Sequence, residues 1–178
     1  MSTTRSIEVF SYDELSPEAQ AEARDWFRVR TEFLRADEYL ASIEALAAHF
    51  GGRVKDYELD WSNSTTPSSM EFEMPDMDPA EIEARLNQLG SFDPETLRGH
   101  GDCKLTGMCY DENAIDGFRR AFFKGETDLE SLMQAAFDSW IESAHKDYDY
   151  DQSDEAVAET IQANDFRFTA EGKRTVVL

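Results

Sequence analysis

Apolar and polar residues follow two different periods along this chain, and the longest pattern is helical. Between residues 128 and 144, apolar side chains recur three and four positions apart, which places them on one face of a helix. Thr127 and Glu130 have the spacing of a capping box at its start. The apolar positions are Leu129, Leu132, Met133, Ala136, Phe137, Trp140, Ile141 and Ala144. Such a face needs a sheet or other helices to cover it.

Further helices are predicted from the same period and from residues that favour helix ends. Ser16 is a good N-cap, and Pro17 suits the first helical position. Glycines suit the ends of the next helices, since a left-handed conformation is accessible to them. The predicted helices cover residues 17–34, 37–50, 80–89, 113–123 and, after a cap at Ser153, 154–163.

Alternation of apolar and polar residues predicts short strands at residues 6–12, 70–74 and 103–110, and turn residues indicate that two pairs of strands form hairpins. The predicted strands cover residues 6–12, 54–61, 70–74, 103–110, 166–169 and 175–178. Because strands and helices do not alternate regularly, we predict an α+β fold. It is expected to form a single domain over residues 1–178, with a mainly antiparallel sheet of about four to six short strands and about five helices packed on it.

Charge is the unusual feature of the composition. The 178 residues include 38 Asp and Glu against 17 Lys and Arg, a net charge of −21, while 40% hydrophobic residues indicate a folded chain rather than a disordered acidic tail. This charge disfavours direct binding to nucleic acid or an anionic membrane and favours a basic protein partner. No apolar run is long enough to cross a bilayer or to act as a signal peptide, so a cytoplasmic location is expected.

The acidic residues gather in two clusters that we interpret as partner-binding surfaces. Acids three or four positions apart on a helix lie about 5–6 Å from each other, a spacing comparable to that of neighbouring phosphates on one DNA strand. Such an array can occupy the Lys and Arg groove of a nucleic-acid-binding protein. An acidic coat that only maintains solubility is the alternative. The first cluster is Asp147, Asp149, Asp151, Asp154, Glu155 and Glu159, and the second is Glu71, Glu73, Asp76 and Asp78.

Motifs for metal binding and catalysis are incomplete. Residues 147–151 match the first three ligand positions of a calcium loop, but Gln152 and Ala158 stand where glycine and a bidentate glutamate are needed, which favours an acidic turn. His100, Cys103 and Cys109 lack a fourth zinc ligand at a recognised spacing. The motifs of serine hydrolases, zinc proteases, P-loops and dinucleotide-binding folds do not occur. We therefore predict neither an enzyme nor a cofactor or metal site.

Three segments resemble those of small acidic proteins from bacteriophage and prophage genomes, a family of largely uncharacterised function. They are residues 10–20 (FSYDELSPEAQ) with Ala23 and Trp26, residues 101–107 (GDCKLTG) and residues 163–173 (ANDFRFTAEGK). The resemblance implies a phage-encoded protein in the bacterial host cytoplasm. Small acidic phage proteins often oppose host defences, including CRISPR complexes, by imitating DNA.

Together, the charge clusters and this context predict a non-enzymatic, anti-CRISPR-like inhibitor that binds the basic surface of a host nucleic-acid-binding protein or CRISPR effector complex. The alternative is a phage accessory or structural protein whose acidity serves solubility. Its partner would bind exposed aromatic residues such as Tyr148 and Tyr150. The oligomeric state stays open.

Overall fold

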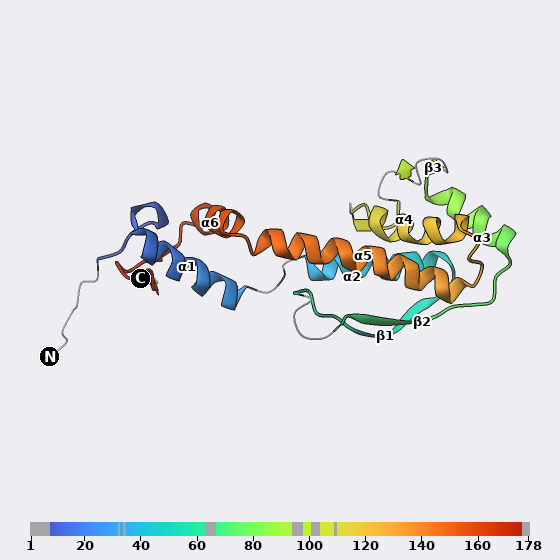
Figure 1. The fold of residues 1–178 in the computed structure, drawn as a ribbon, viewed down its shortest axis with the longest axis horizontal. Helices are drawn as coiled ribbons and strands as arrows, with labels where there is room; N and C mark the ends of the chain where they lie inside the picture. Colours follow the sequence, from blue (N-terminus) through green and yellow to red (C-terminus); the bar gives the residue numbers. More distant parts are fainter. Residues whose placement is uncertain are drawn as a thin grey trace. The chain divides into compact units, whose positions relative to one another are not determined.

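The chain is mainly helical in the residues that the computed structural model describes, which are 8–31, 33, 35–62, 67–93, 98–100, 104–108 and 110–175. The helices are α1 (Pro17–Arg30), α2 (Ala36–His49), α3 (Pro79–Leu86), α4 (Tyr110–Phe123), α5 (Leu129–Asp151) and α6 (Asp154–Ala163) (Figure 1). Short 3₁₀ turns at Tyr12–Glu14 and Asn87–Leu89 precede α1 and extend α3.

The strands in this part of the chain pair only as separate two-stranded antiparallel hairpins. They are β1 (Arg53–Glu58) with β2 (Ser69–Glu73), β3 (Ser91–Asp93) with β4 (Arg98–His100), and β5 (Arg167–Phe168) with β6 (Arg174–Thr175). The prediction of a mainly antiparallel sheet with helices packed on it is therefore wrong. The physical reason is that the helices bury their apolar faces mostly against one another, so no extended sheet is needed to cover them.

Backbone contacts divide the chain into two compact units, Met1–Glu32 with Tyr148–Leu178, and Phe33–Asp147. The single-domain interpretation of residues 1–178 stays a prediction. In the first unit α1 packs against α6. Its core consists of Tyr12, Leu15, Ala19, Ala23, Phe27, Val157, Ile161 and Phe168.

The ends of the helices in the first unit follow the predicted caps. The Ser16 hydroxyl accepts a hydrogen bond from the Ala19 amide (3.3 Å), and the Ser153 hydroxyl accepts one from Ala156 (3.2 Å). The predicted strand at 6–12 is wrong over its described residues, where only Phe10 pairs, by a single bridge to Phe168. The terminal hairpin is confirmed, with β5 and β6 joined by a tight turn.

The second unit has an aromatic core between α2, α4 and α5. Tyr39 of α2 stacks on Tyr110 at a centroid distance of 3.9 Å, and Phe50 stacks on Phe118 at 4.5 Å. The indole N–H of the buried Trp140 donates to the Tyr39 carbonyl (2.8 Å). These contacts explain why the long apolar face predicted at 128–144 is covered by helices.

Two predicted elements of the second unit are corrected by the structure. Residues 104–108, expected in a strand at 103–110, are not a strand: residues 105–108 form bends, and Tyr110 begins α4. Cys103 and Cys109 lie outside the described residues. The expected cap of α5 is also different, because the Asp128 carboxylate, not Thr127, accepts from the Ser131 amide (2.8 Å). The predicted hairpin across residues 62–69 is confirmed by the pairing of β1 with β2.

The length of α5 also differs from the prediction. The helix continues to Asp151, so residues 147–151 form its last turn rather than an acidic turn after it. An ion pair between Lys146 and Glu142 (2.6 Å), one helical turn apart, supports this continuation. In the described part of the chain, no helix combines the length and the apolar character needed to cross a membrane.

Candidate functional site

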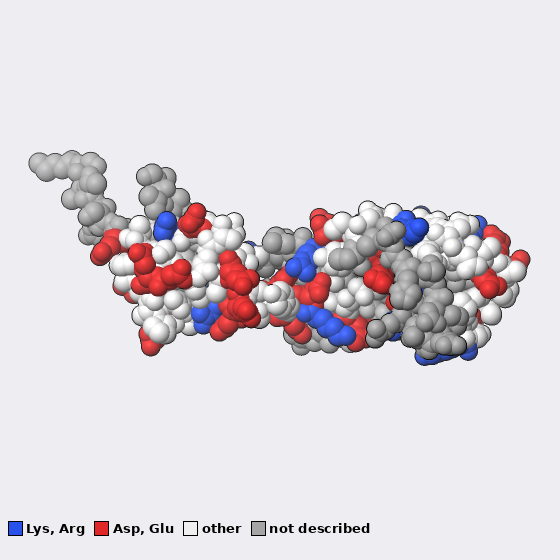
Figure 2. Space-filling view, turned by 90° about the horizontal axis from the view of Figure 1, so that it is seen from above, with Lys and Arg blue, Asp and Glu red and all other residues white. Residues whose placement is uncertain are grey.

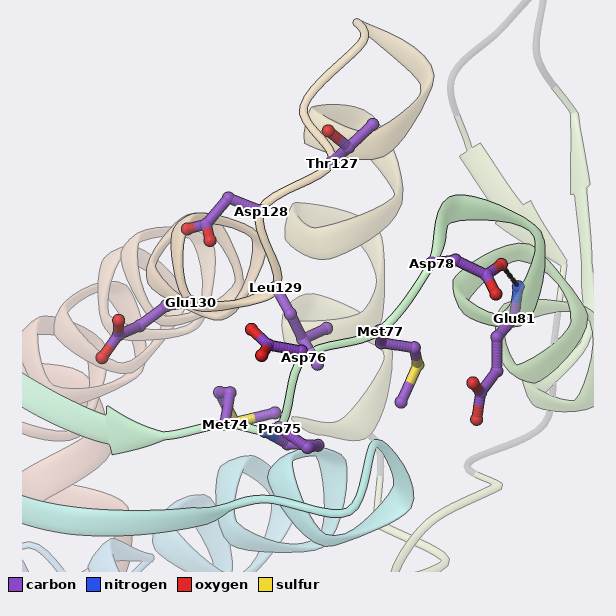
Figure 3. A pocket seen from close by; sticks show the side chains of 10 residues that line it. All are labelled: Met74, Pro75, Asp76, Met77, Asp78, Glu81, Thr127, Asp128, Leu129 and Glu130. Carbon is purple, nitrogen blue, oxygen red and sulfur yellow. Dashed lines mark hydrogen bonds between the residues drawn. The ribbon is translucent and has the colours of Figure 1, made fainter.

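Asp76 and Asp78 of the second acidic cluster border a hollow of about 540 Å³ in the second unit, which we call the acidic hollow. Residues 74–77 cross between the first turns of α3 and α5, and side chains from all three segments line it (Figure 3). Five of the lining residues are carboxylates and four are apolar. They are Asp76, Asp78, Glu81, Asp128 and Glu130, with Met74, Pro75, Met77 and Leu129.

Two of these carboxylates are placed by the helix ends themselves. Asp78 accepts a hydrogen bond from the Glu81 amide (2.9 Å) at the start of α3, as Asp128 does from the Ser131 amide (2.8 Å) at the start of α5. Acidic residues are favoured there because helix N-termini expose unpaired N–H groups and the positive end of the helix dipole. Hydrogen bonding by Ser131 holds the pKa of Asp128 below its ordinary value. These two groups are therefore structural as well as acidic.

The other carboxylates of the acidic hollow are less engaged. Glu81 pairs with Arg85 (2.8 Å), one helical turn further along α3. Asp76 and Glu130 are exposed and form no ion pair or side-chain hydrogen bond within the residues described. The Asp76 and Glu130 carboxylates are thus the groups most available to a cationic partner.

A second hollow of about 380 Å³ shares Asp128 and Glu130 with the acidic hollow and extends it to Glu71 on β2. Glu71 pairs with Lys55 across the hairpin (3.0 Å), and Glu73 pairs with Arg53 (2.5 Å). All four side chains are exposed, and such surface pairs contribute about 0–1 kcal/mol. A more strongly charged partner can therefore replace them at little cost.

The structure thus joins the predicted second cluster to two acids that sequence reasoning missed. Asp128 and Glu130 lie some fifty residues further along the chain and were interpreted only in relation to the start of a helix. The signal that could have found them is the helix start itself, because helix N-termini collect acidic residues. Their proximity to Asp76 depends on tertiary packing.

The first acidic cluster is divided between the two units. Asp147 belongs to the second unit, while the other five acids belong to the first. Within its unit Asp147 accepts hydrogen bonds from the Tyr39 hydroxyl (2.9 Å) and from Arg35 (3.1 Å). Burial raises the pKa of Tyr39 well above its ordinary value, so its hydroxyl stays protonated and can donate. Asp147 is therefore mainly a structural residue.

Asp154 is also bound within its own unit. It forms ion pairs with Arg24 (3.1 Å) and with Arg28, and hydrogen bonding by Arg28 lowers the pKa of Asp154. Asp149, Glu155 and Glu159 are exposed and have no ion pair among the described residues, whereas Asp151 is partly buried. Of the six acids in the first cluster, Asp149, Glu155 and Glu159 are therefore the candidates for binding a partner.

On the face shown in Figure 2, Lys and Arg side chains interrupt the Asp and Glu side chains on each unit. Within the described residues, no group of three or more His, Cys, Asp or Glu is placed to hold a metal ion. The calcium-loop pattern at 147–151 lies in a helix, so the loop geometry that it requires is absent there.

Removing the N-cap of α5 tests whether the Asp128 carboxylate stabilises the fold. Replacing Asp128 with alanine is expected to lower the free energy of unfolding by about 1 kcal/mol at pH 7. Because the folded-state pKa of Asp128 is lowered, its contribution is complete above the ordinary value of 3.8 and is lost as the pH falls through the folded value. Urea denaturation should show that the difference in unfolding free energy between the natural protein and Asp128→Ala is smaller below pH 3.8 than at pH 7. The control Glu83→Ala, on the exposed face of α3, should change stability little at either pH.

Comparisons with known proteins provide no relative for this chain. No protein-family model matches it, and neither a curated protein nor a solved structure does. The case for function therefore depends on the residues and their geometry.

Proposed function

We propose that this protein is a non-enzymatic inhibitor that binds the basic surface of a host nucleic-acid-binding defence protein, in the manner of a phage-encoded, anti-CRISPR-like DNA mimic acting in the bacterial cytoplasm. The observation that carries the proposal is the acidic hollow. There, five carboxylates from three segments surround four apolar side chains in a chain of net charge −21.

The chemistry of the acidic hollow suits Lys and Arg side chains. Their aliphatic stems pack on apolar surface while the charged ends stay at a polar rim, and the hollow offers Met74, Met77 and Leu129 beside its carboxylates. The net charge of the whole chain would speed encounters with a basic protein and repel competing nucleic acid. A groove built for phosphates is a partner of this kind.

Asp149, Glu155 and Glu159 offer a second contact surface in the other unit. Their exposure and lack of ion pairs in the described chain leave their charge uncompensated locally. Acids at positions 155 and 159 lie one turn apart on α6, about 5–6 Å from each other. In this proposal the surface adds affinity, while Asp147 and Asp154 maintain the fold.

The experiment is affinity capture from a bacterial lysate, with elution by a salt gradient and, separately, by duplex DNA. The proposal expects a nucleic-acid-binding protein that both salt and DNA displace, because both compete for the same basic groups. Capture of proteins that resist both eluents, or a captured complex that DNA leaves intact, would contradict mimicry.

Neutralising exposed acids that form no ion pair then tests whether these acids bind the partner. We expect Asp76→Asn with Glu130→Gln and Asp149→Asn to weaken binding of the captured partner at least about tenfold at low salt, at roughly 0.5–1 kcal/mol for each exposed charge. The matched control is a triple variant of Glu38→Gln, Glu44→Gln and Glu112→Gln, which removes the same charge at exposed helical positions elsewhere. Equal loss in both would mean that only net charge matters.

The alternative function, an accessory or structural protein that binds through aromatic residues, is favoured by one observation. Tyr150, in the last turn of α5, is 57% exposed. A complex formed through it should tolerate salt, since apolar contacts are not screened. Binding that persists at 1 M salt but is lost in Tyr150→Ala would establish this alternative instead.

A further inference from the structure

A small basic hollow lies in the first unit of this acidic protein. It has a volume of about 350 Å³ and is formed by α1 between Glu22 and Arg30 and by residues 172–174 at the start of β6. We call it the basic hollow and define it by its six lining residues, Glu22, Trp26, Arg30, Gly172, Lys173 and Arg174. Three of the six are cationic and only one is acidic.

Aromatic rings hold two of the cations in place. The guanidinium carbon of Arg174 lies 5.2 Å from the centre of the Trp26 ring and 4.7 Å from that of Phe166, while that of Arg30 lies 5.9 Å from Trp26. Trp26 in turn contacts Phe166 and Phe168 edge to face, which fixes its orientation. A guanidinium stacked on a ring keeps its N–H donors directed outward, where they can bind a ligand.

The backbone brings Lys173 and Arg174 to this place through a tight contact. Gly172 has a φ of +80°, and a Cβ atom at that position would lie 2.1 Å from the Ala19 carbonyl oxygen of α1. The turn closes by hydrogen bonds from Thr169 to the Lys173 carbonyl and from Gly172 to the Thr169 carbonyl, both 2.9 Å. The chain is thus pressed against α1 at the point where the cations gather.

Eight cations of the described chain form ion pairs with acidic side chains, but the three cations of the basic hollow do not. Ion pairs engage Arg24, Arg28, Arg35, Arg53, Lys55, Arg85, Arg119 and Lys146. Within residues 8–31 and 148–175, Arg30, Lys173 and Arg174 form neither an ion pair nor a side-chain hydrogen bond. Glu22 is the single acid in the lining, and Glu171 attracts Lys173 from the preceding turn, so the three cations still leave an excess of positive charge that an anionic ligand would offset.

We propose that the basic hollow binds a small phosphorylated ligand. Three cations against Glu22 leave a local charge of about +2, which matches a phosphate group of charge near −2, and arginine forks pair with phosphate oxygens in bidentate fashion. The net charge of −21 repels long polyanions, and the volume of about 350 Å³ accommodates a small molecule. This site goes beyond the proposed inhibitor function and uses none of its residues.

The test uses inorganic phosphate and phenyl phosphate as probes in NMR titrations at constant ionic strength. The chain has three tryptophans, and Trp26→Phe identifies the Trp26 indole signal. Saturable shifts of this signal with either probe, without shifts of Trp61 and Trp140, are expected. Saturation by inorganic phosphate alone would assign the free ion, while tighter phenyl phosphate binding would assign a phosphate ester. No saturable shift up to 50 mM of either probe would overturn the proposal.

Variants establish that the cations of the basic hollow are responsible. Arg30→Gln with Arg174→Gln is expected to weaken phosphate binding at least tenfold, and Lys173→Gln, whose exposed side chain forms no ion pair or hydrogen bond in the described residues, several-fold. Lys104→Gln with Lys124→Gln changes the net charge equally at exposed positions of the other unit and should leave affinity unchanged. An equal loss in this control, or tighter binding of succinate than of phosphate, would overturn the assignment. Because these experiments measure phosphate affinity, a negative result would not contradict the proposed function of the acidic surfaces.

Discussion

Replacing Trp140 with alanine is expected to lower the free energy of unfolding by about 3–5 kcal/mol. Trp140 is fully buried, and its ring lies within 5.6–5.8 Å of the rings of Tyr39, Trp61 and Phe137. The substitution removes a large apolar surface from the core of the second unit and leaves a cavity that helices can only partly close. Urea denaturation followed by circular dichroism measures the change.

The control for this prediction lies on the same helix. Tyr150→Ala also removes an aromatic side chain from α5 but from an exposed position, so it should change stability by about 0.5 kcal/mol or less. Trp140→Phe separates two contributions, because it retains most of the apolar surface but loses the hydrogen bond to the Tyr39 carbonyl. If Trp140→Ala destabilises no more than Tyr150→Ala does, the aromatic cluster is not the core of this unit.

Helices were predictable from the sequence because their signals are local. The apolar period of α5 and the caps at Ser16 and Ser153 depend on residues at most a few positions apart, and the structure places helices there. The hairpins were partly predictable for the same reason. Their arrangement was not, since residues 54–61 were predicted only as a strand, without a buried face, whereas in the structure β1 is almost entirely exposed and β2 buries Met70 and Phe72.

Charge patterns were less informative than apolar patterns, because the partner of a charge is seldom near it in the sequence. Asp147 binds Arg35, which lies 112 residues earlier, and Asp154 binds Arg28, which lies 126 residues earlier. Counting acids along the sequence treats Asp147 and Asp154 as unpaired charges. Only the fold separates acids that stabilise a unit from acids such as Asp76 and Glu130, which a partner can use.

The two proposed sites share one physical feature, the way in which their like charges are brought together. In both hollows, backbone geometry rather than charge attraction brings like charges together: helix starts place Asp78 and Asp128, and the Gly172 turn places Lys173 and Arg174. Like charges gathered in this way lower the energy of a counter-charged ligand relative to water. Under the two proposals, the chain would have two surfaces of opposite specificity, one for cationic side chains and one for a small anion.

The largest effect outside the aromatic core is expected at Asp111, the only fully buried acid among the described residues. Its Oδ2 atom accepts from the backbone amides of Leu105 (2.9 Å), Thr106 (2.8 Å) and Gly107 (3.3 Å). Its Oδ1 atom accepts from the Thr106 hydroxyl (2.7 Å). These residues belong to the GDCKLTG segment, whose residues 103–107 were predicted to lie in a strand. Its described part is instead a loop wrapped around one carboxylate at the start of α4.

Asp111→Ala is therefore expected to lower the free energy of unfolding by about 3–5 kcal/mol, since four donors lose a charged acceptor at about 1–3 kcal/mol each and water recovers part of the loss. Asp111→Asn should fall between alanine and the natural residue, because it keeps an acceptor without the charge. Glu112→Ala, exposed in the same helical turn, should change stability by about 0.5 kcal/mol or less. Hydrogen exchange at residues 105–107 should accelerate in Asp111→Ala alone. Unchanged exchange there would mean that the loop holds its shape without the carboxylate.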